Sequence, residues 1–341
     1  MDLDQKIGRM LIVGFKGASV NSDSPILRDI RTLHLGGVIL FDRLLAEKRQ
    51  DNNIISARQL KTLTSDLQAS ARSPLLIAID QEGGRVSRLS RQRGFAPSPP
   101  AAELGASADT GATTRAAQQT AKLLLELGIN FNMAPVVDLN TYADNPIIGG
   151  YQRSFGADPD QVVRHAAAWI TAHSAYGITS CLKHFPGHGS ARADSHLGFV
   201  DVSEYWRDDE LQPYRQLIDE KMVTAVMTGH LYNRYLDPEA PATLSRPTIT
   251  GLLRNRLGFD GVVVSDDMQM QAISRHYGVK EAVCQAIRAG VDLLVFGNNL
   301  SYSPDTTREV VMAIRQGLAE GLVSEAEIDT ACRRIARLLP G

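Results

Sequence analysis

The sequence predicts an α/β protein that folds as a single (β/α)8 barrel of the TIM type. Three observations predict this fold: short apolar runs recur eight times, each run ends in a polar or glycine-rich turn, and amphipathic segments separate the runs. The runs are continuous and do not alternate with polar residues, which is typical of strands buried on both faces of a parallel sheet. Eight strand-then-helix units in 341 residues favour a closed barrel over a doubly wound open sheet.

The predicted strands occupy, in order, residues 11–15, 36–41, 75–80, 129–138, 178–184, 224–230, 261–266 and 291–297. Helical periodicity is clearest at 113–128 and at 158–177, where the second helix starts at an Asp-Pro pair and both end at glycine. The last helices, at about 305–319 and 324–338, complete the barrel. We therefore expect residues 1–341 to form one catalytic domain.

Charge and cysteine content exclude several classes of protein. Lys and Arg total 36 against 38 Asp and Glu, and the two signs are mixed along the chain, so no nucleic acid or acidic membrane is expected as a partner. Cys181, Cys284 and Cys332 are far apart and form no CxxC pair, so a disulfide network or a zinc cluster is not indicated. We expect a monomer without a metal or other cofactor.

The N-terminus and the hydropathy bear on location. No apolar run reaches the roughly 18 residues needed to span a bilayer. Met1 leads directly into the polar stretch DLDQKIG, without the basic and apolar regions of a signal peptide. We expect a cytoplasmic protein; an exported protein whose signal peptide had been removed would present the same sequence.

Polar residues gather where the predicted strands end. In a barrel these ends form the face that carries the active site, so one pocket would collect carboxylates, histidines and a lysine. Asp80 and Asp266 could instead cap helices, and His230 could be a satisfied loop histidine, but such readings explain the whole set poorly. The residues in question are Asp80, Asp138, Lys183, His184, His230, Asp266 and Asn298.

The stretch GVVVSDDMQM delivers two carboxylates to that face. Asp266 directly follows the strand and is the better candidate to point into the pocket, whereas Asp267 could cap the following helix or orient its neighbour. A carboxylate in a pocket able to hold a sugar suggests a glycosidase nucleophile that forms a covalent glycosyl-enzyme.

A retaining glycosidase also needs a proton donor for the leaving oxygen. Asp194 and His196 are two residues apart in a Gly- and Pro-rich loop, so the carboxylate can accept from one imidazole nitrogen while the other faces the substrate. Such a dyad stabilises the imidazolium, and the ordinary pKa of histidine already suits acid–base catalysis.

A metal site is the main alternative for the same residues. His184, His188, His196 and Asp266 could in principle bind zinc, but the sequence has no H-x-H pair at a strand end and no H-E-x-x-H helix. Glu82 and the two glycines after it are expected to shape the turn after the third strand rather than to act in catalysis.

Seven segments together resemble one known family, the bacterial single-domain β-N-acetylhexosaminidases of glycoside hydrolase family 3. The resemblance covers about residues 5–335, and the combination of KHFPGHG, DSH and SDD is its most specific part. The segments are AIDQEGGRVSRL (78–89), NMAPVVDLN (132–140), GGYQRSFGADP (149–159), KHFPGHG (183–189), DSH (194–196), TGHL (228–231) and GFDGVVVSDDMQM (258–270).

The resemblance implies a catalytic set and a sugar-binding set. Asp266 would be the nucleophile and His196, paired with Asp194, the general acid/base. The hydroxyls of the non-reducing sugar would be held by Asp80, Arg88, Arg153, Lys183 and His184. Such side chains can donate to or accept from several sugar oxygens.

Within the family, the DSH loop goes with GlcNAc substrates and with peptidoglycan recycling. The expected reaction is release of GlcNAc from GlcNAc-1,6-anhydro-MurNAc fragments. Three alternatives stay open: a β-glucosidase, a phosphorylase that transfers the glycosyl group to phosphate, and a sugar-binding barrel without catalysis. A histidine acid/base would not repel a phosphate anion, whereas retention of both Asp266 and His196 disfavours the binding protein.

Overall fold

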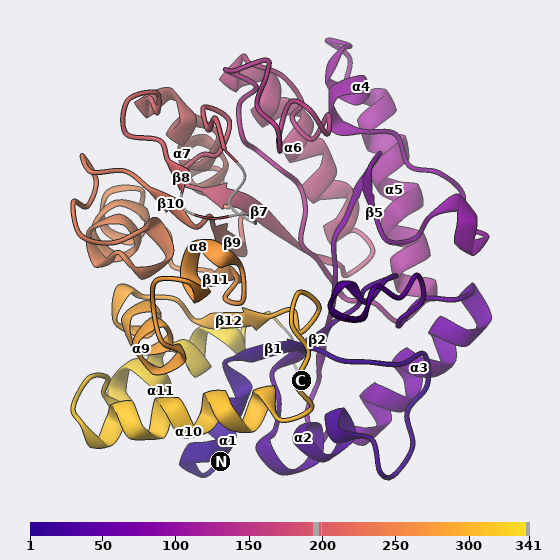
Figure 1. Ribbon diagram of the computed structural model, residues 1–341. Coiled ribbons are helices and arrows are strands. Elements are labelled where there is room, and N and C mark those ends of the chain that lie inside the picture. Colours follow the sequence, from indigo (N-terminus) through magenta and orange to yellow (C-terminus); the bar gives the residue numbers. More distant parts are fainter. Residues whose placement is uncertain (194–197, 199, 339–341) are drawn as a thin grey trace.

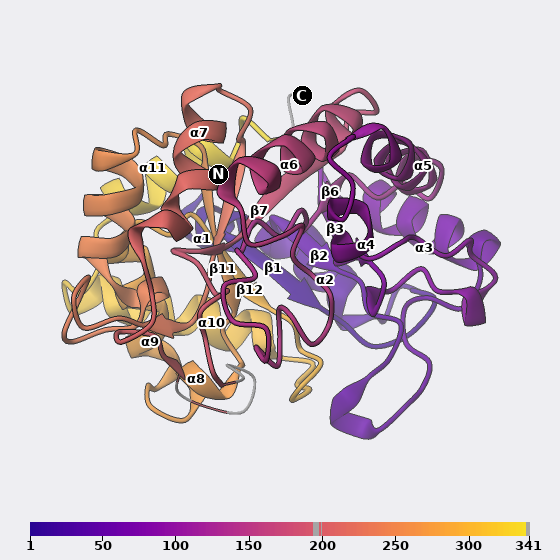
Figure 2. The same cartoon turned by 90° about the horizontal axis from the view of Figure 1, so that it is seen from above.

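A computed structural model describes residues 1–193, 198 and 200–338. Eight parallel strands close into a barrel in the order β1-β12-β11-β9-β7-β6-β3-β2. The helices surround these strands in Figure 1, and Figure 2 shows the molecule turned by 90°, with helices on both sides of the strands. The predicted (β/α)8 barrel is therefore confirmed.

All eight predicted strands are present at the predicted places. The barrel strands are β1 (Leu11–Gly14), β2 (Gly37–Ile39), β3 (Leu76–Ile79), β6 (Phe131–Asn132), β7 (Thr179–Phe185), β9 (Ala225–Thr228), β11 (Val262–Asp267) and β12 (Leu293–Phe296). β1 pairs in parallel with β2 and with β12, which closes the barrel between the first and the last strand. Their side chains are almost all buried, as expected for strands covered on both faces.

The helices follow the strands in the alternating order that the sequence predicts. They are α1 (Leu3–Arg9), α2 (Pro25–Leu33), α3 (Ala57–Ser70), α4 (Ala101–Gly105), α5 (Gly111–Glu126), α6 (Pro159–Ser174), α7 (Gln212–Asp219), α8 (Gln271–Ser274), α9 (Val279–Ala289), α10 (Thr306–Ala319) and α11 (Glu325–Ile335). Between β9 and β11 the helix is the π-helix Pro247–Arg256. The Asp-Pro start of α6 is confirmed, because the Asp158 side chain accepts from the amide of Asp160. α1 packs against α2, α10 and α11 on the outside of the barrel.

The fourth barrel strand is much shorter than the sequence predicts. Regular pairing in β6 ends after Asn132, whereas the apolar run predicted a strand over 129–138. Pro135 has no amide N–H to donate, so it interrupts the ladder. Beyond Asn132 the chain keeps single backbone hydrogen bonds to its neighbours, such as Met133 N–H to the Ile79 carbonyl, and a bridge between Val136 and Lys183. Met133 and the loop that follows β6 line the pocket described below.

Two small sheets extend the face at the carboxyl ends of the strands. β4 (Gln81–Gly83) pairs with β5 (Val86–Ser87) as an antiparallel hairpin, and β8 (Val200–Asp201) pairs with β10 (Leu231–Tyr232) in parallel. The hairpin contains Glu82 and the two glycines that were expected to shape the turn after the third strand. Within the described residues, no helix combines the length and apolar character required to cross a membrane.

Candidate active site

A pocket of about 370 Å³ opens at the carboxyl ends of the barrel strands. It falls in the size range of small-ligand sites. Its charged and polar lining comes from the ends of β3, β7 and β11 and from the loops that follow β2, β3 and β6. The lining residues predicted from the sequence are Asp80, Arg88, Arg153, Lys183, His184 and Asp266, and they are joined by Glu82 and Asp267.

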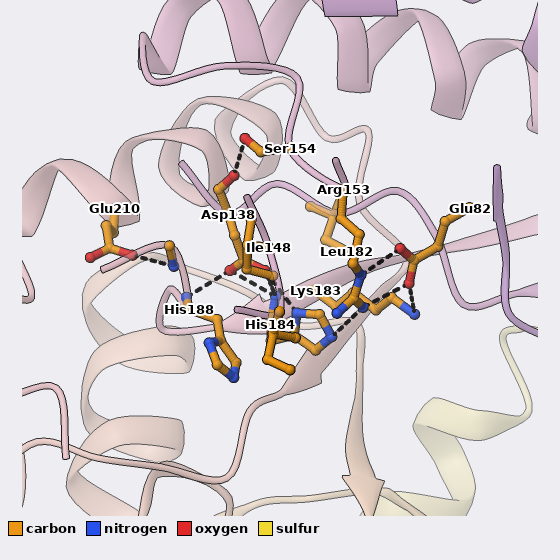
Figure 3. A network of polar contacts seen from close by, with 12 residues as sticks. Glu82, Asp138, Ile148, Arg153, Ser154, Leu182, Lys183, His184, His188 and Glu210 are labelled. Atoms are coloured by element: carbon orange, nitrogen blue, oxygen red, sulfur yellow. Dashed lines mark hydrogen bonds and ion pairs between the residues drawn. The ribbon is translucent and has the colours of Figure 1, made fainter. Parts of the chain in front are cut away.

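Glu82 is the centre of a buried network of ion pairs (Figure 3). Its carboxylate accepts two hydrogen bonds from the Arg153 guanidinium, both 2.8 Å long, and lies 2.7 Å from the Lys183 ammonium. Lys183 also donates to Asp80 Oδ1 at 2.8 Å. The expectation that Glu82 only shapes a turn is therefore incomplete, because its side chain fixes two of the predicted sugar-binding cations.

The charges in this network determine each other's protonation. Burial alone would raise the pKa of Glu82, but Arg153 and Lys183 outweigh burial and hold this pKa at about 2. Burial likewise opposes ionisation of Asp80, yet Lys183 and Arg88 lower its pKa. Burial disfavours the charged ammonium of Lys183, but Asp80 and Glu82 raise its pKa. All of these groups are therefore charged at neutral pH.

Asp138 orients the imidazole of His184. Its carboxylate contacts His184 Nδ1 at 2.7 Å and accepts from the backbone amides of His184 and His188. Arg153 approaches His184 Nε2 at 3.2 Å, and because a guanidinium only donates, Nε2 is the acceptor and Nδ1 carries the proton. Consecutive residues Lys183 and His184 both line the pocket, and the peptide bond between them is cis.

Two neighbouring carboxylates end β11. Asp266 lines the pocket, and its Oδ1 accepts from the amide of Asp267 at 2.8 Å. Asp267 Oδ1 accepts from the amides of Gln269 and Gly297, both at 3.0 Å, so this carboxylate ties the turn after β11 to the end of β12. His230 supports the same turn, because its Nε2 lies 2.9 Å from the Asp267 carbonyl oxygen.

Arg88 forms the side of the pocket next to Asp80. Its guanidinium lies 3.3 Å from Asp80 Oδ2 and 5.4 Å from the ring centroid of Phe41. The ring and the carboxylate together hold the guanidinium over the pocket. Arg88 therefore joins Asp80 and Lys183 in one hydrogen-bonding surface.

Asp194 and His196, the predicted acid/base dyad, lie outside the described residues. Their roles stay predictions. Among the residues that the structure does describe, no group of three or more His, Cys, Asp and Glu side chains is arranged to hold a metal ion.

A parallel barrel whose strand ends present carboxylates and cations to one small pocket has the arrangement of a barrel glycosidase. The chain belongs to glycosyl hydrolase family 3: the model "Glycosyl hydrolase family 3 N terminal domain" matches residues 2–338. This match confirms the family expected from the sequence motifs.

Individual relatives agree with this assignment. The chain is 37% identical to the Beta-hexosaminidase of Tolumonas auensis, over 93% of this chain and 89% of that protein. It is 34% identical to Beta-hexosaminidase A of Pseudoalteromonas piscicida, over 89% of this chain but 53% of that protein. The solved structure of a glycoside hydrolase family 3 beta-N-acetylglucosaminidase from Paenibacillus sp. str. FPU-7 matches with a TM-score of 0.89 and 35% identity, over 99% of this chain and 62% of that one. The chain thus spans about half to three fifths of the length of the last two proteins.

Glu82→Gln tests the ion-pair network. Because the pKa of about 2 lies below the ordinary 4.5, ionised Glu82 stabilises the fold above about pH 4.5, and this stabilisation is lost as the pH falls from 4.5 toward 2. We expect the variant to lose on the order of 3 kcal/mol of unfolding free energy at pH 7, from the size of the pKa shift. In urea unfolding curves, the difference in unfolding free energy between the wild type and Glu82→Gln should become smaller below pH 4.5.

The matched control is Glu126→Gln at an exposed position of α5. It should change the unfolding free energy by less than about 0.5 kcal/mol at either pH. An equal loss for Glu82→Gln at pH 7 and pH 3 would contradict the coupling of Glu82 to Arg153 and Lys183.

Proposed function

We propose that this protein is a retaining exo-β-N-acetylglucosaminidase that forms a covalent glycosyl-enzyme on Asp266. One observation carries the proposal: the Asp266 carboxylate shares a small pocket with side chains able to hold the hydroxyls of a single sugar, namely Asp80, Arg88, Arg153, Lys183 and His184. A small pocket, unlike a long cleft, suits the terminal residue of a chain. The names of the relatives, Beta-hexosaminidase and beta-N-acetylglucosaminidase, support GlcNAc as that residue.

In the first half of the proposed reaction, Asp266 attacks the anomeric carbon of the bound sugar. The bond from that carbon to the leaving oxygen breaks, and the oxygen takes a proton from the His196 imidazolium. Asp194 stabilises the positive charge on the imidazole before transfer. Lys183, Arg153 and their carboxylates keep the sugar in place, so that attack is intramolecular.

In the second half, neutral His196 takes a proton from a water molecule. The water oxygen attacks the anomeric carbon, the bond to Asp266 breaks, and the sugar leaves with retained configuration. The enzyme returns to a carboxylate on Asp266 and an imidazolium on His196. No cofactor is required for either half.

The natural leaving group that we propose is the 1,6-anhydro-MurNAc part of a peptidoglycan fragment. The outer part of the pocket is lined by three exposed apolar or aromatic side chains, Leu45, Tyr151 and Leu300. Exposed Arg85 also lines it, with its guanidinium 5.5 Å from the Tyr151 ring centroid. An apolar surface beside a cation fits a sugar ring that bears a carboxylate.

Asp266→Asn tests the nucleophile and the reaction class together. We expect wild-type protein to hydrolyse 4-nitrophenyl β-GlcNAc and not the β-glucoside, and the variant to lose turnover by several orders of magnitude because an amide is a poor nucleophile. Both substrates are assayed with and without phosphate, and exposed Asp144→Asn serves as the control that keeps activity.

Other outcomes of this assay point to other functions. Preference for the glucoside would indicate a β-glucosidase, and sugar 1-phosphate formed only with phosphate present would indicate a phosphorylase. Binding of GlcNAc by wild-type protein without any turnover would indicate a sugar-binding barrel. Full activity of Asp266→Asn would remove Asp266 as the nucleophile.

His196→Ala tests the general acid. A good leaving group such as 4-nitrophenolate departs without a proton, whereas an alkyl or sugar leaving group needs one. We expect kcat/KM to fall by about 10²–10⁴-fold for an alkyl β-GlcNAc and by much less for the 4-nitrophenyl substrate. Equal losses on the two substrates would remove His196 from this role.

Arg85→Ala tests the leaving-group side of the pocket. Loss of one exposed charge-assisted hydrogen bond should raise KM about 10-fold for a GlcNAc-1,6-anhydro-MurNAc substrate, and leave KM for 4-nitrophenyl β-GlcNAc unchanged. Arg91→Ala, an exposed arginine outside the pocket lining, should change neither value. A rise in KM for both substrates would place Arg85 against the GlcNAc ring instead.

A further inference from the structure

The segment that follows β7 is irregular yet buried. His188 is 2% exposed, Ser190 4% and Ala191 not at all. Residues 186–191 lie outside any helix or strand, so the neighbouring strands do not satisfy their backbone N–H and C=O groups. A buried loop of this kind is stable only if other groups supply those hydrogen bonds.

Side chains from two sides supply the hydrogen bonds of this segment. On one side, Asp138 accepts from the His188 amide at 2.8 Å, and Asn145 Nδ2 donates to the His188 and Gly189 carbonyls at 2.8 and 3.0 Å. On the other side, Trp206 Nε1 donates to the Pro186 carbonyl and Glu210 accepts from the Gly189 amide, both at 3.0 Å. The segment is therefore held in place from both sides.

Glu210 packs directly against this segment. Its side chain belongs to the 3-10 turn Asp208–Leu211, is 1% exposed, and lies beside the loop (Figure 3). A Cβ at Gly187 would come within 2.6 Å of Glu210 Cβ, and Gly187 also has a φ of +125°. Only glycine fits both the conformation and the contact at this position.

Ionisation of Glu210 is energetically unfavourable at its buried site. Burial, with a smaller contribution from nearby Asp138, raises the pKa of this carboxyl to about 7, although hydrogen bonds from Ser190 and the Gly189 amide favour the ionised form. No lysine or arginine of the described chain forms an ion pair with Glu210 that would offset burial. A neutral side chain would be cheaper at such a site, so stability alone does not account for a carboxyl here.

The stretch 205–210, which carries Trp206 and Glu210, also contacts the loop at Arg192. The Arg192 guanidinium lies 3.6 Å from the ring centroid of Tyr205 and 5.0 Å from that of Tyr142. Three contacts therefore join this stretch to the loop: Tyr205 with Arg192, Trp206 with Pro186, and Glu210 with Gly189. Arg192 is two residues before Asp194, so these contacts reach almost to the predicted acid/base dyad.

We infer that Glu210 is a positioning residue for the general acid/base: by accepting from the Gly189 amide it fixes the described segment that precedes the predicted dyad in the sequence. This inference rests on the proposed function of the dyad. Glu210 does not act on the substrate itself. Its loss should therefore damage proton transfer more than sugar binding or nucleophilic attack.

The test compares three variants on two substrates. Glu210→Leu removes the acceptor, Glu210→Gln keeps an acceptor oxygen but no charge, and Asp209→Asn changes an exposed neighbouring carboxylate as the matched control. A displacement of about 1 Å can cost about 10²-fold in rate. For Glu210→Leu we expect kcat to fall by about that factor on an alkyl β-GlcNAc and by less than about 3-fold on 4-nitrophenyl β-GlcNAc, with KM unchanged on both.

Glu210→Gln should lie between the wild type and Glu210→Leu, and Asp209→Asn should match the wild type on both substrates. Because a glutamine side chain fills the same space as the glutamate, Glu210→Gln keeps the test valid where the leucine variant fails to fold. Equal losses on the two substrates would overturn the inference and leave Glu210 a purely structural residue. Wild-type protein that cleaves neither substrate would instead refute the proposed function.

A second readout isolates the charge of Glu210. Its folded-state pKa of about 7 lies above the ordinary 4.5. The folded protein therefore loses stability as the pH rises from 4.5 through 7, because the buried carboxyl ionises less readily than in the unfolded chain. Three titratable groups of the described chain lie around Glu210, and none of the three titrates between pH 5 and 8: the pKa of Asp138 is lowered, that of His188 is about 4, and that of Tyr214 is raised above its usual value.

We therefore expect the Tm of Glu210→Gln, relative to that of the wild type, to be higher at pH 8 than at pH 5. The relative gain follows because glutamine removes a charge that is costly only at the higher pH. A difference in Tm that is the same at both pH values would contradict an ionised, buried Glu210. Asp209→Asn should show no such change.

Discussion

The pocket depends on one buried carboxylate, that of Glu82, which binds Arg153 and Lys183 at the same time. Removing three charges from water is costly, and only close pairing offsets the cost, so the side chains have one stable arrangement. That arrangement ties the hairpin after β3, the loop after β6 and strand β7 to each other. It also leaves the charged tips of Lys183 and Asp80 at the pocket surface.

Carboxylates in this molecule differ in role because their surroundings differ. Glu82 is neutralised by two cations and has a pKa of about 2, whereas Glu210 is buried, pairs with no lysine or arginine of the described residues, and has a pKa of about 7. Asp266 is partly exposed to the pocket and is the group that we propose to attack the sugar. Opposite shifts of this kind let one side chain type serve structure, positioning and chemistry in a single fold.

The sequence predicts the barrel strands well and the contacts between buried charged side chains poorly. Continuous apolar runs mark all eight barrel strands, but apolar character alone overestimates the fourth, because Pro135 lies within the run at 129–138 and regular pairing in β6 ends after Asn132. The motif residues Asp80, Lys183 and Asp266 are expected on one face because strand ends meet there, and they do line one pocket. Glu82 is expected only in a turn, and no signal in the sequence marks Glu210, because neither its burial nor its partner is local.

By itself, the sequence determined the barrel, the family and the candidate residues at the strand ends, since apolar periodicity and motifs are properties of short segments. Only the tertiary structure decided which charges meet. Lys183 reaches Asp80 across 103 residues, and Arg153 reaches Glu82 across 71. Contacts between residues so far apart in the sequence form because the barrel closes and the loops run around its mouth. The resulting pairings set the pKa values and the shape of the pocket, which no local pattern specifies.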